Sequence, residues 1–123
     1  MNPKKILIVE DDSFLQGLAS SKLEKDGFSV TGAGNSDEAA HALDTDTPDL
    51  ILLDLVLPGT DGFGILKKIR EGIKTKDTPV IVFSNLSEEA DIKHAKDSGA
   101  TDYMVKSNFT LDELSARIKE ILS

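Results

Sequence analysis

The chain has 123 residues, enough for one domain that buries its own core without covalent cross-links. It contains no cysteine, which excludes disulfides and thiolate zinc sites, and its apolar runs are too short for a bilayer span or a signal peptide. Fourteen basic and 22 acidic residues give a net charge of −8, which opposes attraction to nucleic-acid phosphates and anionic membranes. We therefore expect a single cytoplasmic domain over residues 1–123, a monomer or weak dimer that binds neither DNA nor membranes.

Short apolar runs rich in β-branched residues alternate with longer segments of helical periodicity, a pattern typical of βαβ units on a parallel sheet. The runs predict strands at residues 5–9, 28–33, 50–53, 80–83 and 101–105. The first, third and fourth are almost uniformly apolar, as in strands covered on both faces, whereas the other two mix polar and apolar residues as edge strands do. The sequence predicts an α/β fold: a doubly wound, flavodoxin-like, five-stranded parallel sheet of order 2-1-3-4-5 with five flanking helices.

Capping residues predict where the helices begin. The segment 13–26 opens with Ser13-x-x-Gln16, which we interpret as a capping box, and the last helix opens with a second such pair, Thr110-x-x-Glu113. The expected N-caps of the three middle helices are Ser36, Asp61 and Ser87. The apolar face expected for the first helix consists of Leu15, Leu18, Ala19 and Leu23.

Polar side chains follow four of the predicted strands, at the ends that lie together in a parallel sheet. They are Glu10, Asp11 and Asp12 after the first strand, Asp54 after the third, Ser84 after the fourth and Lys106 after the fifth. The first and third strands flank the switch point of the predicted order, where open parallel sheets bind ligands. Neighbouring carboxylates repel unless a cation relieves them, and Mg²⁺ prefers oxygen ligands. We expect Asp11 and Asp54 to bind Mg²⁺ directly, and Glu10 to act through water.

This set of residues suits phosphoryl transfer. With Mg²⁺ bound, Asp54 can act as a carboxylate nucleophile toward a phosphoryl donor, because the reaction needs mainly positioning and positive charge. Lys106 supplies such a charge, and the Ser84 hydroxyl can donate to a phosphoryl oxygen. The resulting aspartyl phosphate can draw both residues inward and bias a two-state element.

The same residues resemble the motifs of one family, the receiver domain of two-component response regulators, especially the single-domain, CheY-like regulators of chemotaxis and phosphorelays. The matching elements cover the whole length: Ile8-Val9-Glu10-Asp11-Asp12, Asp54-x-x-Leu57-Pro58-Gly59-x-Asp61-Gly62, Ser84 and Tyr103-x-x-Lys106. The resemblance implies that Asp54 is the phosphoacceptor and that Glu10 and Asp11 are its acidic pair. It also implies that the Val56 carbonyl is a main-chain metal ligand.

The resemblance further implies that Ser84 and Tyr103 are switch residues and that Lys106 binds the phosphoryl group. The implied donor is a phosphohistidine on a sensor histidine kinase or a histidine phosphotransfer protein. The implied output surface comprises residues 87–97, 101–105 and 110–122. It would bind an output protein whose identity stays open. A docking face for the donor is expected on the first helix, at Phe14, Gly17 and Leu18.

One departure from the family pattern concerns the residue after the lysine. The family usually has proline there, often with a cis bond, whereas this chain has Ser107. A cis bond before a residue other than proline costs about 2.5–4 kcal/mol. We expect a trans Lys106–Ser107 bond, the alternative being a strained cis bond held by the phosphate site.

A signalling receiver catalyses only its own phosphorylation and dephosphorylation and is not otherwise an enzyme. Three other functions are possible alternatives. A phosphorelay intermediate or phosphate sink uses the same residues and stays open. A Mg²⁺-dependent aspartyl-phosphate phosphohydrolase usually carries a second aspartate two positions after the nucleophile, where this chain has Val56. A flavodoxin-like cofactor carrier needs a phosphate-binding loop after the first strand, and the acidic residues there would repel the anion.

Overall fold

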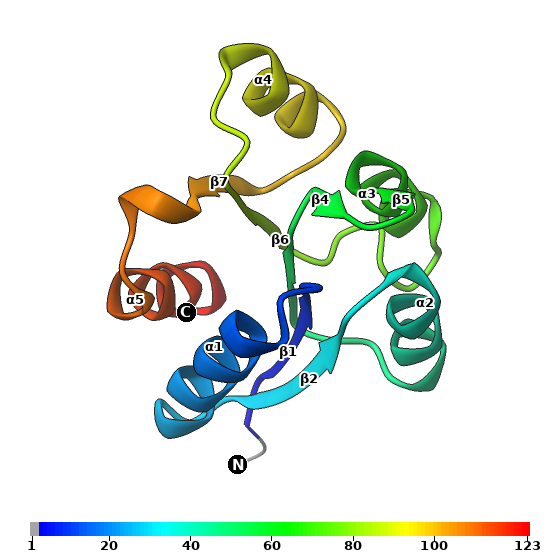
Figure 1. Cartoon of the computed structure of the whole chain (residues 1–123). Coiled ribbons are helices and arrows are strands. Elements are labelled where there is room, and N and C mark those ends of the chain that lie inside the picture. The colour runs from blue at the N-terminus through cyan, green and yellow to red at the C-terminus, as the bar shows by residue number, and fades with distance from the viewer. Residues whose placement is uncertain (1–2) are drawn as a thin grey trace.

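The computed structural model describes residues 3–123 and shows one twisted sheet between two layers of helices (Figure 1). The elements, in chain order, are β1 (Lys5–Val9), α1 (Ser13–Lys25), β2 (Ser29–Ala33), α2 (Ser36–Thr45), β3 (Leu50–Leu53), β4 (Val56–Leu57), β5 (Thr60–Asp61), α3 (Gly62–Glu71), β6 (Val80–Ser84), α4 (Glu89–Asp97), β7 (Asp102–Val105) and α5 (Leu111–Leu122). The main sheet is parallel, with order β2-β1-β3-β6-β7. Because β4 and β5 form a separate pair, this is the predicted order 2-1-3-4-5.

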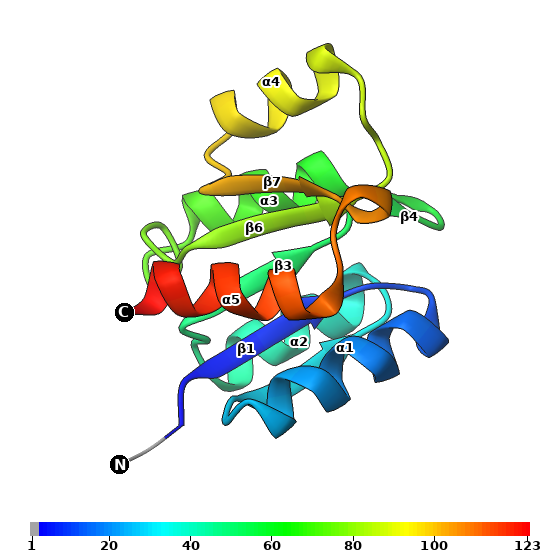
Figure 2. The same cartoon turned by 90° about the vertical axis from the view of Figure 1, so that its left-hand side faces the viewer.

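Alternate side chains of the central strands enter two separate cores, one on each face of the sheet. Ile6, Ile8, Leu50, Leu52 and Ile81 pack under α1 and α5. Leu7, Val9, Ile51, Leu53 and Val82 pack under the layer that contains α2, α3 and α4. Figure 2 shows α5 and α1 together on one side of the sheet. The near-uniform apolar character of β1, β3 and β6 thus reflects burial on both faces, as predicted.

Two of the predicted helix caps are correct. Asp61 accepts a hydrogen bond from the Phe63 amide at the start of α3. Thr110 and Glu113 form the reciprocal capping box expected for α5. In both helices the cap residue stands directly before the apolar stretch that packs against the sheet.

Three predicted caps are wrong. Asp12 rather than Ser13 caps α1, because its carboxylate, a stronger acceptor at the positive end of a helix, takes the amides of Phe14 and Leu15. Gln16 is therefore not part of a capping box, and its side chain donates to the carbonyl oxygen of Glu10 instead. The amide oxygen of Asn35, rather than Ser36, caps α2, and Glu88, rather than Ser87, precedes α4 with no side-chain capping bond.

The buried face of α1 is narrower than its sequence predicts. Ala19 and Leu23 are buried and Leu15 is half-buried, but the Leu18 side chain is 45% exposed. Leu18 therefore lies on the outer surface of α1 rather than in the core. None of the helices within residues 3–123 combines the length and apolar character that crossing a bilayer would need.

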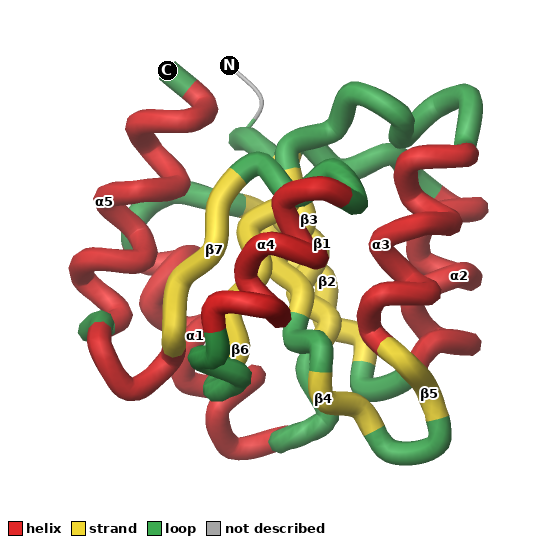
Figure 3. The backbone as a smooth tube through the Cα atoms, turned by 90° about the horizontal axis from the view of Figure 1, so that it is seen from above, coloured by secondary structure: helices red, strands yellow, loops and turns green. Residues whose placement is uncertain are grey.

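The short hairpin β4–β5 is an element that the sequence analysis did not predict. Val56 pairs with Asp61 and Leu57 with Thr60, so Pro58 and Gly59 form the turn, with φ of +67° at Gly59. Proline followed by a residue of positive φ is the arrangement of a type II turn. The hairpin extends from the edge of the sheet where the strands end (Figure 3). The hairpin connects Asp54 to α3, and its turn depends on the positive φ of Gly59.

Two glycines in the first turn of α3 offer a test of this packing. A Cβ added at Gly62 would lie 2.4 Å from the Cα of Leu55, whereas one added at Gly64 meets nothing within 4 Å. We expect Gly62→Ala to lower the free energy of unfolding by about 1–3 kcal/mol, because the backbone beside Asp54 must shift. The matched control, Gly64→Ala, should raise it by up to about 1 kcal/mol. Urea unfolding measures both, and equal effects would contradict the close contact.

Candidate functional site

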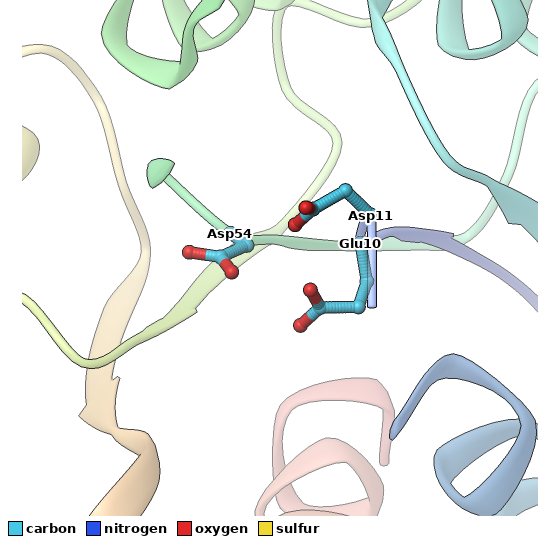
Figure 4. Close-up of side chains that lie close together, drawn as sticks. All are labelled: Glu10, Asp11 and Asp54. Atoms are coloured by element: carbon cyan, nitrogen blue, oxygen red, sulfur yellow. The ribbon is translucent and has the colours of Figure 1, made fainter. Parts of the chain in front are cut away.

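The three acidic residues of the predicted site lie together at the ends of β1 and β3. Val9 pairs with Leu53, so Glu10 and Asp54 leave the sheet side by side. The backbone holds both positions, since the Glu10 amide donates to the Ala33 carbonyl and the Asp54 amide to the Val9 carbonyl. One carboxylate oxygen from each of Glu10, Asp11 and Asp54 lies within 4.8 Å of the others (Figure 4). The three carboxylates therefore form a cluster at the edge of the sheet where the sequence predicts a metal site.

Lys106 joins this cluster from the end of β7. Its Nζ atom lies 2.7 Å from Oδ2 of Asp54 and 2.5 Å from Oε1 of Glu10. All three side chains are nearly inaccessible, with 14% of Lys106 and 6% of each carboxylate residue exposed. A buried ammonium shared between two buried carboxylates keeps all three charges paired.

Burial and pairing act in opposite directions on these charges. Burial is the main influence on Glu10 and raises the pKa of its carboxyl, although the hydrogen bond from Lys106 partly offsets it. For Lys106 burial is the largest single influence and lowers the pKa. The hydrogen bonds to Asp54 and Glu10, together with the negative charges of both residues, outweigh it, so the pKa is raised. The raised pKa keeps the lysine charged at neutral pH.

The donors at this site fit the expected Mg²⁺. Three carboxylates with one ammonium leave two negative charges in a space where three oxygens converge, which suits a divalent cation with oxygen ligands. Asp11 is exposed, whereas Glu10 and Asp54 are buried, so one side of the cluster is open. Asp12 is not in this cluster and instead caps α1. The Val56 carbonyl stays a predicted ligand; its amide donates to Oδ1 of Asp54 at 3.0 Å.

The two predicted switch residues lie on the neighbouring strands β6 and β7. Ser84 is completely buried and pairs with Val105, the residue before Lys106. Its Oγ atom accepts a long, 3.4 Å hydrogen bond from the Leu86 amide. The hydroxyl of Tyr103 donates to the Leu86 carbonyl at 2.6 Å. Both switch candidates therefore hold the same short segment after β6.

The predicted docking residues are on the surface of α1. The Phe14 side chain is 75% exposed, and Gly17 and Leu18 are exposed beside it. The Lys106–Ser107 bond is trans, as expected, and a short 3-10 helix over Lys106–Asn108 leads to α5.

Sequence reasoning missed two contacts of this site. The Val56 amide orients Asp54, and the Gln16 side chain holds the carbonyl of Glu10. Backbone donors such as the first carry no sequence signal. The Gln16 contact did have a sequence signal, since a glutamine near the start of α1 can reach back over the preceding turn. Its spacing from Ser13 suggested a capping box instead.

The comparison with known families decides what this site belongs to. The family model of the response regulator receiver domain matches residues 6–119. This chain belongs to the receiver-domain family. Its similarity in sequence extends to KdpE, a transcriptional regulatory protein of Staphylococcus aureus, at 45% identity over 95% of this chain and 49% of the relative. It also extends to PhoB, the phosphate regulon regulator of Escherichia coli, at 37% identity over 97% of this chain and 52% of that protein.

Solved structures confirm the fold of this receiver domain. The chemotaxis protein CheY4 of Vibrio cholerae has a TM-score of 0.91 at 26% identity, over 98% of this chain and 99% of that one. The receiver domain of the Francisella response regulator 1452 has a TM-score of 0.87 at 31% identity, over 97% and 96%. The receiver domain spans about half the length of the curated relatives it matches and nearly all of these solved chains.

The raised pKa of Glu10 predicts how stability changes with pH. Because the folded state holds this proton above the unfolded value of 4.5, ionisation of Glu10 lowers stability as pH rises from about 4.5 through the folded pKa. Glu10→Gln lacks this loss. We expect its free energy of unfolding, relative to the wild type and without metal, to increase over that pH range.

Urea unfolding at a series of pH values in EDTA measures the difference. Glu24→Gln, at an exposed position on α1, controls for the loss of one negative charge. A difference between Glu10→Gln and wild type that shrinks as pH rises would contradict the raised pKa.

Proposed function

We propose that this receiver domain accepts a phosphoryl group on Asp54 from a phosphohistidine donor and thereby changes its affinity for a protein partner. The observation that carries the proposal is the Lys106 ammonium bound to Asp54 at 2.7 Å, beside two further carboxylates. An acidic cluster alone would suit a simple metal site. The buried Lys106 ammonium beside Asp54 can, in addition, stabilise the negative charge of a transferred phosphoryl group.

Each residue of the site has a proposed role in the phosphoryl transfer. An oxygen of Asp54 forms the new O–P bond while the donor's N–P bond breaks and its electron pair returns to the imidazole nitrogen. The Val56 amide and Lys106 hold the two Asp54 oxygens before transfer. Asp11, Asp54 and, through water, Glu10 would hold Mg²⁺, with the Val56 carbonyl as a main-chain ligand. Bound Mg²⁺ supplies positive charge to the phosphoryl oxygens.

The response to transfer is proposed to begin at Ser84 and Lys106. A phosphoryl group brings acceptor oxygens and nearly two negative charges, to which the Ser84 hydroxyl and the Lys106 ammonium can move. Since Ser84 and Tyr103 both contact Leu86, a movement of this segment reaches Tyr103 on β7. The proposed output surface covers residues 87–97, 101–105 and 110–122, which contain α4, β7 and α5.

Other features of the proposal rest on the family and the charge. A phosphorelay intermediate or phosphate sink would use the same chemistry, with a second phosphotransfer protein as its partner. A phosphohydrolase is disfavoured because Val56 stands where such an enzyme needs a general acid.

The names of KdpE and PhoB describe transcriptional regulators, yet we propose no DNA contact for residues 1–123, given the net charge of −8. We keep the predictions of a cytoplasmic location and of a monomer or weak dimer.

Phosphorylation of Asp54 can be tested without knowing the kinase. After incubation with acetyl phosphate and Mg²⁺, intact-mass spectrometry should show a gain of one phosphoryl group. Asp54→Ala should abolish the gain and EDTA should prevent it, while Asp44→Ala, at an exposed position on α2, should leave it unchanged. Lys106→Met should slow it at least tenfold, because a charge that stabilises the transferring group is lost. Modification of Asp54→Ala to the wild-type level would refute Asp54 as the acceptor.

The docking face on α1 can be separated from the chemistry. Phe14→Ala should slow phosphotransfer from the cognate donor protein at least tenfold, because an exposed aromatic contact is lost, but leave acetyl phosphate labelling unchanged. Ile73→Ala is the matched control, since Ile73 is 90% exposed on the loop between α3 and β6. If both variants slow transfer equally, or neither does, Phe14 is not a specific docking contact.

A further inference from the structure

Gln16 connects α1 to the backbone of the acidic cluster. Its Nε2 atom donates to the carbonyl oxygen of Glu10 at 2.8 Å. Gln16 also lines, with Glu10 and Asp54, one small pocket at the ends of β1 and β3. A side chain of the first helix thus reaches over the turn 10–12 to the residue at which β1 ends.

The peptide unit that Gln16 holds is the one that joins Glu10 to Asp11. A peptide unit is planar, so holding its carbonyl oxygen also restricts the positions of the two Cα atoms from which the Glu10 and Asp11 side chains start. On the other side of Glu10, its amide donates to the Ala33 carbonyl at 2.9 Å. The backbone on both sides of Glu10 is therefore anchored, once by β2 and once by Gln16.

Gly32 on β2 makes room for this contact. A Cβ added at Gly32 would lie 2.2 Å from Oε1 and 2.7 Å from Cδ of Gln16. These atoms are the end of a flexible side chain, so an alanine at position 32 would displace the Gln16 amide rather than the backbone. No positive φ explains this glycine, because the positive values among residues 3–123 are at Gly27, Gly59 and Gly99.

We propose that Gln16 is a positioning residue for the metal and phosphoryl site, and that Gly32 is the glycine that lets its amide reach Glu10. The inference rests on the proposed function, since its consequence is that the Glu10–Asp11 pair is held ready for Mg²⁺. Gln16 touches neither the metal nor the phosphoryl group in this scheme. Its contribution is the orientation of the two carboxylates before the cation arrives.

The test is a double-mutant cycle on Mg²⁺ affinity, measured by isothermal titration calorimetry with Mg²⁺ as the only ligand. Gln16→Ala should weaken binding about fivefold, the factor of one ordinary hydrogen bond. Gly32→Ala should weaken it to a similar degree by displacing the same amide. The double variant should bind no worse than Gln16→Ala alone, because there is no amide left to displace. Ser21→Ala, at an exposed position on α1, is the control.

A second measurement separates positioning from general destabilisation. In metal-free protein, the ¹⁵N chemical shift of the Asp11 amide should change in Gln16→Ala and in Gly32→Ala, since its nitrogen shares the peptide unit that Gln16 holds. The urea midpoint without metal should stay close to that of the Ser21→Ala control.

The possible results of the Mg²⁺ titrations overturn different parts of the proposal. Unchanged Mg²⁺ affinity in Gln16→Ala, with a wild type that binds, overturns the role of Gln16 but leaves the proposed function intact. Additive losses in the double variant overturn the link between Gly32 and Gln16. A wild type that binds no Mg²⁺ overturns the metal site itself, and this inference with it.

Discussion

The Lys106 ammonium shared by Glu10 and Asp54 is the interaction on which the rest of the site depends. Without it, the two buried carboxylates would hold protons or move apart, and the acidic cluster would lose its charge or its geometry. The ammonium pairs with both, at 2.5 and 2.7 Å, yet the cluster with Asp11 still has more negative than positive charge. The ion pairs therefore hold the carboxylates together, and the remaining negative charge would favour a bound cation.

The sheet topology brings these residues together and keeps them in place. Lys106 is 96 residues from Glu10 and 52 from Asp54 in sequence, but parallel strands all end at the same edge. At the opposite edge of the sheet, a charged side chain makes only structural contacts. There the Arg70 guanidinium donates to the carbonyl oxygens of Thr75, Thr78 and Gly99, and so ties α3 to two loops. At one edge of the sheet the charged residues form the proposed functional site, and at the other Arg70 connects helix and loops.

The sequence predicted the strands, their order and the residues that meet at the carboxyl edge, because burial on two faces and repeated βα alternation both leave strong patterns. Local choices between adjacent polar residues were not predictable in the same way. Asp12 instead of Ser13 and Asn35 instead of Ser36 cap their helices, since either neighbour is a good cap and the backbone geometry decides. The hairpin β4–β5 was missed because pairs of two residues have no periodicity. Gln16 matched the spacing of a capping box, yet its side chain acts on the turn that precedes the helix.

The contacts that link the proposed phosphoacceptor to the proposed output surface pass through the backbone of one residue, Leu86. Leu53 pairs with Val82, so Ser84 lies about one residue beyond the level of Asp54 on the adjacent strand. The Leu86 amide donates to Ser84 and the Leu86 carbonyl accepts from Tyr103. The first bond is long, at 3.4 Å, and therefore weak, whereas the second is short, at 2.6 Å. A phosphoryl oxygen that recruits the Ser84 hydroxyl would act on the weaker bond, and Leu86 would then move with Tyr103 rather than stay with Ser84. A change at the buried end of β6 would in this way reach the surface on β7 through a single peptide segment.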